Sequence, residues 1–280
     1  MTLPTHVGVY GGGRMGAGIA HAFLVCGAYV TIIESSAESA AAARERVESS
    51  LARAADRGHL EAGAAPTLER LTVSTEAAPL SDCGLVVEAV PELTDLKRKV
   101  LAAIESAAPD AWIATNTSSL SVDALASTLA RPQRFIGLHF FNPVPASQLV
   151  EIVVGAKTAP ELVDLSRSWV ADLGKTAIAV TDSPGFASSR LGVAIALEAM
   201  RMLEEGVATA EDIDTAMELG YKHPVGPLRT TDIVGLDVRL AIADHLAREV
   251  GDRFAPPSIL REKVAAGHLG RKSGQGFYTW

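Results

Sequence analysis

The first part of the chain alternates short apolar runs with longer stretches of strong helix formers. Residues 36–57 and 93–107 are dense in Ala, Leu, Glu and Arg, which favour helices. The apolar runs are rich in β-branched residues, which is typical of buried parallel strands. These runs cover residues 7–10, 29–33, 84–89, 112–115, 135–138 and 149–154. The repeated order of strand, helix and strand predicts a doubly wound α/β domain with a mainly parallel sheet.

The pattern changes near residue 183. The last apolar run of this kind lies near residues 178–180, and no convincing strand follows Asp182-Ser183-Pro184-Gly185. Pro184 suits the start of a helix. Helices are expected at residues 186–206, 211–219, 237–250 and 258–266. We therefore predict two domains, an α/β domain over residues 1–183 and a smaller all-α domain over residues 184–280.

A glycine-rich turn follows the first predicted strand. It reads Gly11-Gly12-Gly13-Arg14-Met15-Gly16 and has the spacing G-x-G-x-x-G. Gly11 allows the tight turn out of the strand, Gly13 lets the backbone approach a pyrophosphate, and Gly16 lets the next helix pack close to the sheet. The helix N-terminus then offers free N–H groups to the anion. Because a strand precedes the turn and a helix follows it, we expect a Rossmann-type dinucleotide site rather than a glycine-rich surface loop.

Two charged residues refine the predicted cofactor. Glu34 ends the second strand, 18 residues after Gly16. A carboxylate there accepts hydrogen bonds from both ribose hydroxyls and repels a 2′-phosphate, so NAD is favoured over NADP. Arg14 either contacts phosphate or is an exposed residue at the helix start, and Met15 beside it belongs to the same predicted cofactor-binding turn.

Polar side chains gather in the second half of the predicted sheet. Ser118 follows the strand at 112–115, His139 and Asn142 follow the strand at 135–138, and Glu151 interrupts an apolar run. The C-terminal ends of parallel strands form the ligand crevice of such sheets, so we expect these residues to converge there.

His139 and Glu151 suggest proton transfer. A histidine titrates near neutrality and suits a general base. A buried carboxylate needs a partner, and Glu151 pairs most naturally with His139, where it would orient the ring and stabilise the imidazolium. Each residue also has a plain structural interpretation: a core histidine, an edge-strand acid, and, for Ser118, an N-cap turn. Because all three residues occur together after a dinucleotide motif, the catalytic interpretation is favoured over the structural one.

The composition narrows the function further. The chain has 280 residues, 48% apolar and 21% charged, with a net charge of −8, which is ordinary globular usage and does not suggest nucleic acid or an anionic membrane as a partner. Two cysteines predict neither a disulfide framework nor a zinc site, and no metal is expected. Neither a signal-peptide pattern nor an apolar run of the ~18–20 residues a membrane span needs is present, so a cytoplasmic protein is expected.

The chain resembles the 3-hydroxyacyl-CoA dehydrogenase family over essentially its whole length, especially the short 3-hydroxybutyryl-CoA dehydrogenases. The resemblance is carried by motifs that occur in the same order. These are GVYGGGRMGAGIAHAF at 8–23, VVEAVPELTDLKRKV at 86–100, ATNTSSLSV at 114–122, RFIGLHFFNPVP at 134–145, DSPGFASSR at 182–190, GYKHPVGPLRTTDIVGLDV at 220–238 and GRKSGQGFYTW at 270–280.

The resemblance implies an activity and a set of catalytic residues. The reaction is the reversible NAD-linked oxidation of an L-3-hydroxyacyl thioester, carried by coenzyme A or by an acyl carrier protein. Ser118 matches the residue that hydrogen-bonds the substrate's 3-oxygen and also lies by the cofactor, His139 matches the catalytic base and Glu151 its partner acid. The C-terminal domain is expected to form a homodimer and to contribute to the substrate site.

The resemblance also implies further contacts. Glu92 and Lys97 match positions that contact the nicotinamide half of NAD, and the family lysine also reaches the acyl-CoA. Asn142 matches another cofactor contact that also orients substrate. Lys272, in the C-terminal tail, matches a further NAD contact.

Three departures from the family pattern stand out. Ser189 occupies the position of an active-site asparagine, and a serine cannot hydrogen-bond with both ends of an amide. Glu34 replaces the more usual aspartate without changing the charge. The helix after it, where the family places a serine and a lysine toward coenzyme A, has Glu38 and Arg44-Glu45-Arg46.

The departures leave two alternatives open. One is a dehydrogenase of a free hydroxy or sugar acid, whose carboxylate would need an arginine, such as Arg190 or Arg229, near His139. The other is a non-catalytic NAD-binding or structural relative.

Overall fold

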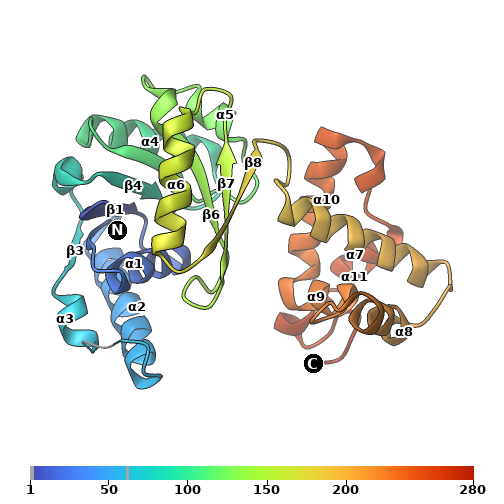
Figure 1. The fold of residues 1–280 in the computed structure, drawn as a ribbon. Coiled ribbons are helices and arrows are strands. Elements are labelled where there is room, and N and C mark those ends of the chain that lie inside the picture. Colours follow the sequence, from blue (N-terminus) through green and yellow to red (C-terminus); the bar gives the residue numbers. More distant parts are fainter. Residues whose placement is uncertain (1–2, 61–62) are drawn as a thin grey trace. The chain divides into compact units, whose positions relative to one another are not determined.

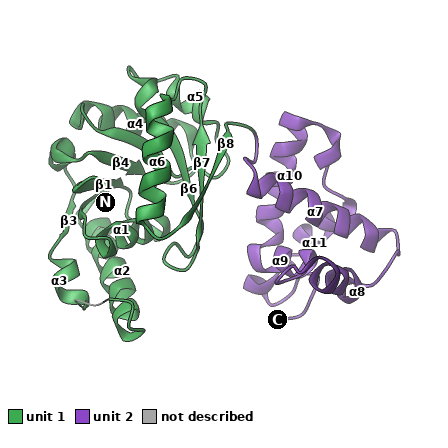
Figure 2. Cartoon of the chain, in the orientation of Figure 1, with its two compact units in different colours: residues 1–183 green, residues 184–280 purple. Residues whose placement is uncertain are grey.

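The computed structural model describes residues 3–60 and 63–280, and the chain divides into two compact units between Ser183 and Pro184 (Figures 1 and 2). This is where the strand pattern of the sequence stops. The first unit contains the sheet, and the second is helical.

The sheet of the first unit has eight strands in the described part of the chain, in the order β3-β2-β1-β4-β5-β6-β7-β8. The order reverses between β1 and β4, which places the switch point of a doubly wound sheet beside the glycine-rich turn. The strands are β1 His6–Tyr10, β2 Tyr29–Ile33, β3 Leu71–Ser74, β4 Leu85–Glu88, β5 Trp112–Thr115, β6 Phe135–Phe140, β7 Leu149–Val154 and β8 Thr176–Thr181.

The predicted doubly wound, mainly parallel fold is confirmed, with one correction. Residues 149–154 form a strand, but β7 runs antiparallel to β6 rather than parallel to it. Only eight residues, 141–148, connect the two strands. A parallel crossover needs a dozen or more residues, so the chain turns back on itself. β8 pairs parallel to β7.

One strand boundary differs from the sequence prediction, and one strand was not predicted. β6 continues to Phe140, so His139 lies inside the strand rather than after it. β3 was not predicted, because its four residues, Leu-Thr-Val-Ser, are half polar and lie at the edge of the sheet. A short, half-exposed edge strand carries little of the apolar signal that marks a buried strand.

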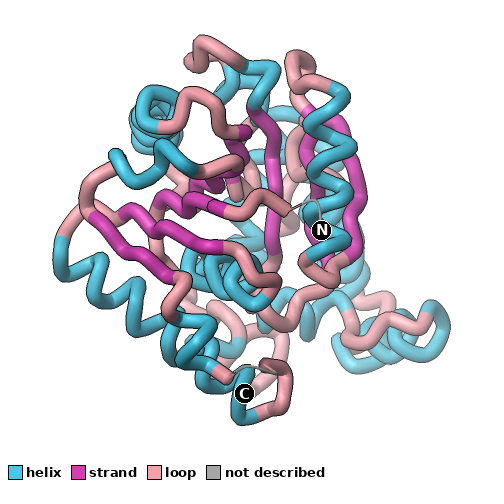
Figure 3. Tube along the Cα trace, turned by 60° about the vertical axis from the view of Figure 1, so that its left-hand side comes forward, coloured by secondary structure: helices cyan, strands magenta, loops and turns pink. Residues whose placement is uncertain are grey.

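Helices cover both faces of this sheet (Figure 3). α1, α2 and α6 share a core with one face, where Phe23, Val47 and Trp169 are buried. Burying one such side chain contributes about 1.5–3 kcal/mol. α4 packs on β4 and β5, and α5 on β6. The helices are α1 Arg14–Val25, α2 Ala37–Asp56, α3 Ala64–Leu68, α4 Thr94–Ala107, α5 Val122–Ala126 and α6 Pro160–Asp172, with 3-10 turns η1 Ala78–Asp82 and η2 Pro132–Arg134.

The second unit packs its helices around a separate core that includes Leu197, Met200 and Leu246. The four predicted helices are present within a few residues. The helix α9 was not predicted, because Gly226 and Pro227 at its start and two threonines within it resemble a loop. The elements are α7 Ser188–Glu204, α8 Ala210–Thr215, the π-turn η3 Ala216–Gly220, α9 Pro227–Val234, α10 Leu236–Val250, α11 Ser258–Ala265, and the 3-10 turns η4 Asp252–Phe254 and η5 Arg271–Ser273.

Asp232 fastens the C-terminal tail to α9. Its buried carboxylate accepts hydrogen bonds from the Phe277 N–H (2.8 Å), the Tyr278 N–H (2.9 Å) and the Trp280 indole N–H (2.8 Å). A Cβ on Gly276 would lie 2.2 Å from an Asp232 carboxylate oxygen, so a glycine is needed where the tail passes. The tail that carries Lys272 is therefore held at a fixed place on this unit.

Candidate active site

The glycine-rich turn connects β1 to α1, and its glycines serve different purposes. Gly11 has φ of 96°, a left-handed conformation that favours glycine. A Cβ on Gly16 would lie 1.8 Å from the Gly11 carbonyl oxygen, so α1 packs against the turn only because Gly16 has no side chain. A Cβ on Gly13 would meet nothing within 4 Å. The fold itself therefore does not require a glycine at 13, whereas a pyrophosphate lying close to the backbone does.

Glu34 lies beside this turn at the end of β2. Its carboxylate accepts hydrogen bonds from the Gly12 N–H (2.5 Å) and the Ser35 N–H (3.2 Å). The acid expected to bind ribose is thus held next to the glycine-rich turn. Arg14 is exposed on the first turn of α1, and Met15 is partly buried against the core.

Glu92 organises the turn after β5, which contains Ser118. One carboxylate oxygen of Glu92 accepts hydrogen bonds from the Ser118 N–H (2.9 Å), the Ser119 N–H (3.1 Å) and the Thr117 hydroxyl. Burial by itself would raise the pKa of Glu92, but the Lys97 ammonium and these hydrogen bonds outweigh it and lower that pKa below its usual value. The structure therefore brings Glu92 and Ser118 together at neighbouring strand ends.

Lys97 is buried rather than exposed to a ligand. Its side chain is 1% exposed, and Nζ donates to Glu88 Oε1 (2.7 Å) and the Val90 carbonyl (3.2 Å) and lies 3.2 Å from Glu92 Oε2. Glu88, which is fully buried at the end of β4, was not singled out from the sequence. The signal that could have found it was a carboxylate in or directly after an apolar run, as at Glu151 and Glu34.

His139 and Glu151 form a buried pair. His139 Nδ1 lies 2.8 Å from Glu151 Oε2, and the two residues are 6% and 0% exposed. They are direct partners across the antiparallel β6–β7 ladder, so both side chains project from the same face. The predicted pair is present, but the antiparallel register produces it rather than the convergence of parallel strand ends. The Phe141 ring packs on the imidazole, with centroids 4.4 Å apart.

Asn142 lies in the connection between β6 and β7 and is exposed. The Lys175 ammonium donates to the carbonyls of Val144 (2.7 Å) and Ser147 (2.6 Å), which holds this connection against β8. The Asn116 side-chain oxygen accepts the Phe140 N–H (3.0 Å) and links the ends of β5 and β6.

Ser189 and Lys272 belong to the second unit. Ser189 is half-buried in the first turn of α7. Lys272 Nζ lies 2.6 Å from both carboxylate oxygens of Asp237. The hydrogen bond from Lys272 is the largest influence on Asp237 and lowers its pKa.

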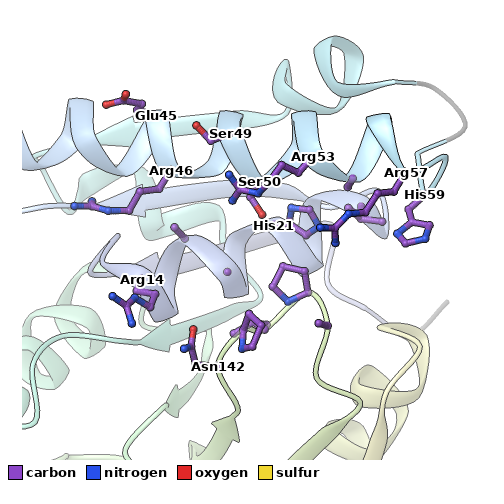
Figure 4. Close-up of a pocket in the computed structure, with 18 residues that line it drawn as sticks. Arg14, His21, Glu45, Arg46, Ser49, Ser50, Arg53, Arg57, His59 and Asn142 are labelled. Atoms are coloured by element: carbon purple, nitrogen blue, oxygen red, sulfur yellow. The ribbon is translucent and has the colours of Figure 1, made fainter. Parts of the chain in front are cut away.

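A pocket of about 810 Å³ lies between α1, α2 and the β6–β7 connection, and sequence reasoning did not find it (Figure 4). Glu45 is the one carboxylate among its described lining residues, and its side chain points away from α1 in Figure 4, whereas Arg53 and Arg57 lie near His21. The signal that could have found it was a helical spacing, since Arg46 and Arg53 lie on one face of α2 and Arg57 follows directly after the helix. Its basic lining residues are Arg14, His21, Arg46, Arg53, Arg57 and His59.

The residues first considered for coenzyme A on this helix lie only partly in the pocket. Arg46 and Glu45 line it, but Glu38 and Arg44 do not. Arg44 instead contacts the Leu71 carbonyl (3.4 Å) and Glu48 (3.9 Å). The basic face of α2 thus begins at Arg46 and extends toward the C-terminal end of the helix.

Residues 3–60 and 63–280 contain no group of three or more His, Cys, Asp or Glu side chains arranged to hold a metal ion. Among the described helices, none combines the length and apolar character needed to span a membrane.

The amino-acid sequence matches two family models that cover nearly the whole chain. Residues 6–183 match "3-hydroxyacyl-CoA dehydrogenase, NAD binding domain", and residues 185–280 match "3-hydroxyacyl-CoA dehydrogenase, C-terminal domain". A 3-hydroxybutyryl-CoA dehydrogenase of Mycobacterium tuberculosis is 41% identical over 279 residues, which is 98% of this chain and 98% of the relative.

Solved structures show the same similarity. The (S)-3-hydroxybutyryl-CoA dehydrogenase of Ralstonia eutropha superposes with a TM-score of 0.94 at 41% identity and covers 99% of both chains. A diketoreductase, whose structure is described with catalysis of dicarbonyl compounds, superposes with a TM-score of 0.87 at 30% identity over 100% of both chains.

Proposed function

The chain belongs to the 3-hydroxyacyl-CoA dehydrogenase family, and from this we propose that it oxidises a short L-3-hydroxyacyl-CoA reversibly to the 3-oxoacyl-CoA. The resemblance seen in the sequence motifs is confirmed. The protein is an NAD-dependent oxidoreductase of this type. Coenzyme A as the carrier, the short acyl chain and the reversibility are our proposal.

The observation that carries the proposal is the buried pair of His139 and Glu151. With Nδ1 directed at the carboxylate 2.8 Å away, the neutral imidazole keeps its proton on Nδ1 and its basic lone pair on Nε2. His139 then takes the hydroxyl proton of the substrate at Nε2. Glu151 stabilises the positive charge that arrives on the ring.

The glycine-rich turn suits NAD. Gly13 leaves open space at the N-terminus of α1, where free N–H groups favour a pyrophosphate, and Glu34 is held beside the turn to receive the ribose hydroxyls. When bound, NAD supplies the acceptor for the hydride from C3 of the substrate. We assign Arg14 and Met15 to this half of the cofactor site and Glu92 to the nicotinamide half, where the buried Lys97 acts through Glu92 rather than by direct contact.

The remaining residues orient the reactants. We propose that the Ser118 hydroxyl hydrogen-bonds the 3-oxygen of the substrate, because the Glu92 carboxylate fixes the backbone of its turn. Asn142 is assigned to cofactor and substrate contacts, Ser189 to substrate orientation, and Lys272 to the cofactor. These four assignments rest on the family motifs.

The pocket beside α2 supports coenzyme A rather than an acyl carrier protein. Coenzyme A carries its phosphates on a nucleotide that is remote from the thioester, and Arg46, Arg53 and Arg57 offer guanidinium groups that match phosphate oxygens. We infer that this pocket, in the same unit as His139, receives that nucleotide.

A substrate panel with purified protein tests the proposal. NADH absorbance is followed with 3-hydroxybutyryl-CoA, the same acyl group on an acyl carrier protein, and free 3-hydroxybutyrate. The coenzyme A thioester should be oxidised with the highest kcat/KM, and His139→Gln should abolish turnover while NADH still binds. A free hydroxy acid is the second candidate, because the departures at Ser189 and Arg44 weaken the match to the family's coenzyme A contacts. The proposal fails if the free acid is preferred.

We also propose a homodimer formed through the second unit. This unit exposes large apolar side chains, including Leu191 (64%), Leu219 (69%) and Tyr221 (76%). A second copy would remove such surface from water through a two-fold interface. A cytoplasmic location remains a prediction from the sequence.

A further inference from the structure

We infer that Glu88 is a positioning residue, which acts through Lys97 to hold Glu92 and the turn of Ser118 in the geometry that cofactor and substrate require. The part of this inference that concerns substrate rests on the proposed function. The part that concerns NADH binding does not.

Glu88 is anchored in the sheet. It is 0% exposed at the end of β4, and Thr115 is its partner in the β4–β5 ladder. One carboxylate oxygen accepts the Thr115 hydroxyl (2.6 Å), and the other accepts the Val90 N–H (2.8 Å) and the Lys97 ammonium (2.7 Å). A fully buried carboxylate is costly to desolvate, and this one is matched by three donors that fix its position.

Lys97 connects this anchor to the loop that follows β4. An ammonium has three N–H donors, and here three acceptors surround it: Glu88, the Val90 carbonyl and Glu92. All three donors are thus used within the protein. The ammonium is therefore placed as a link between Glu88, which is rigid, and Glu92, whose side chain is 33% exposed.

Glu92 transmits the constraint to the next strand end. Its second oxygen accepts hydrogen bonds from the Ser118 and Ser119 N–H groups and from the Thr117 hydroxyl. A Cβ on Gly11 would lie 3.0 Å from the Ala89 backbone, so the same loop also borders the glycine-rich turn. Displacing reacting groups by 1 Å can cost about 10²-fold in rate, so a link of this kind is expected to matter for catalysis.

Two variants, one single and one double, separate positioning from ordinary stabilisation. Lys97→Met leaves Glu88 as an unpaired buried charge and should lower Tm strongly. In the double variant Glu88→Gln/Lys97→Met, the amide that replaces the Glu88 carboxylate is neutral, so most of the loss in Tm should be recovered. Glu92 still lacks its ammonium partner there, so kcat/KM should stay at least ~10-fold below wild type and NADH should bind more weakly.

A matched control and a pH profile sharpen the test. Glu105→Gln changes a mostly buried carboxylate at the other end of α4, where it accepts the Ala130 N–H (2.9 Å) and the Arg131 N–H (2.8 Å), and it should leave kcat/KM unchanged. Without the Lys97 ammonium, one of the groups that lower the pKa of Glu92 is lost, so this pKa should be higher than in wild type. The acid limb of kcat/KM should therefore move to higher pH in the double variant.

The outcomes are distinct. If the double variant regains both Tm and kcat/KM to wild-type values, the pair only stabilises the fold and the inference is overturned. The same holds if NADH affinity, measured by fluorescence titration, and the acid limb do not change. If wild-type protein oxidises none of the thioesters, the proposed function fails, but the NADH titration still tests the role of Glu88.

Discussion

Replacing Glu151 by glutamine tests the central pair of the site. The substitution keeps the size of the side chain and removes its charge, 2.8 Å from His139 Nδ1. In the resting protein, a hydrogen bond to a charged group is exchanged for a neutral one, a loss of about 1 kcal/mol. The larger loss comes when His139 takes up the substrate proton, because an imidazolium then faces an amide instead of a carboxylate.

The size of that loss follows from the geometry. At an effective dielectric constant of about 20, two opposite charges about 4 Å apart attract each other by about 4 kcal/mol, and each ~1.4 kcal/mol is tenfold in rate. Relaxation of the site reduces this figure, so we expect kcat to fall by about 10²–10³-fold, within the range for lost proton handling.

The assay measures kcat for 3-hydroxybutyryl-CoA, NADH affinity and Tm in wild type and in Glu151→Gln. Affinity should be unchanged, because the glycine-rich turn is on β1 and Glu151 is on β7. Glu161→Gln, an exposed acid in the first turn of α6, is the matched control and should leave kcat unaltered. A Glu151→Gln protein that keeps wild-type kcat would refute the role of Glu151 in stabilising the imidazolium.

Four further outcomes are expected. Arg57→Ala should raise KM for the coenzyme A thioester about tenfold by removing one charge-assisted phosphate contact. Arg44→Ala, which changes a residue of α2 outside the pocket, should leave KM unchanged. If Arg57→Ala has the same KM as wild type, the pocket has no part in substrate binding. Ser189→Asn should raise kcat/KM for 3-hydroxybutyryl-CoA by a few-fold to ~10-fold, because an amide adds a hydrogen bond worth about 0.5–1.5 kcal/mol; an unchanged or lower value contradicts this. Burial, with help from Lys175 and Arg53, lowers the pKa of His21 to about 4 from its ordinary 6.5. Wild type should therefore lose stability as pH falls from 6.5 to 4, and His21→Gln should lose less. Urea melts at several pH values measure this loss of stability. Light scattering should give the mass of a dimer, and Leu191→Glu should shift it toward the monomer; a wild-type monomer with full activity would contradict the proposed interface.

The local features of the site could be predicted from the sequence because they are set by a few neighbouring residues. The glycine spacing is one example, since the left-handed Gly11 and the close approach at Gly16 are requirements of one turn. The helices α2, α4 and α10 are others, since periodicity and helix propensity are properties of a continuous segment. Glu34 could be predicted for the same reason, because it directly follows the next strand after the turn.

The contacts between distant segments could not be predicted in the same way. Apolar content identified residues 149–154 as a strand, but its direction depends on the eight-residue connection, and only the antiparallel register sets Glu151 opposite His139. Lys97 lies on a helix rich in charged residues, and only the packing of that helix against β4 buries it beside Glu88. The basic pocket required α2 to lie against α1 and the β6–β7 connection.

The amino-acid sequence by itself thus determined the order of most elements, the glycine-rich turn, and which polar residues were candidates for chemistry. The tertiary structure decided which of them meet, as His139 with Glu151 and Glu88 with Lys97. The physical reason is range. Dihedral preferences and periodicity act over a few residues, whereas strand direction, register and the burial of a charge are settled by the packing of segments that are far apart in the chain.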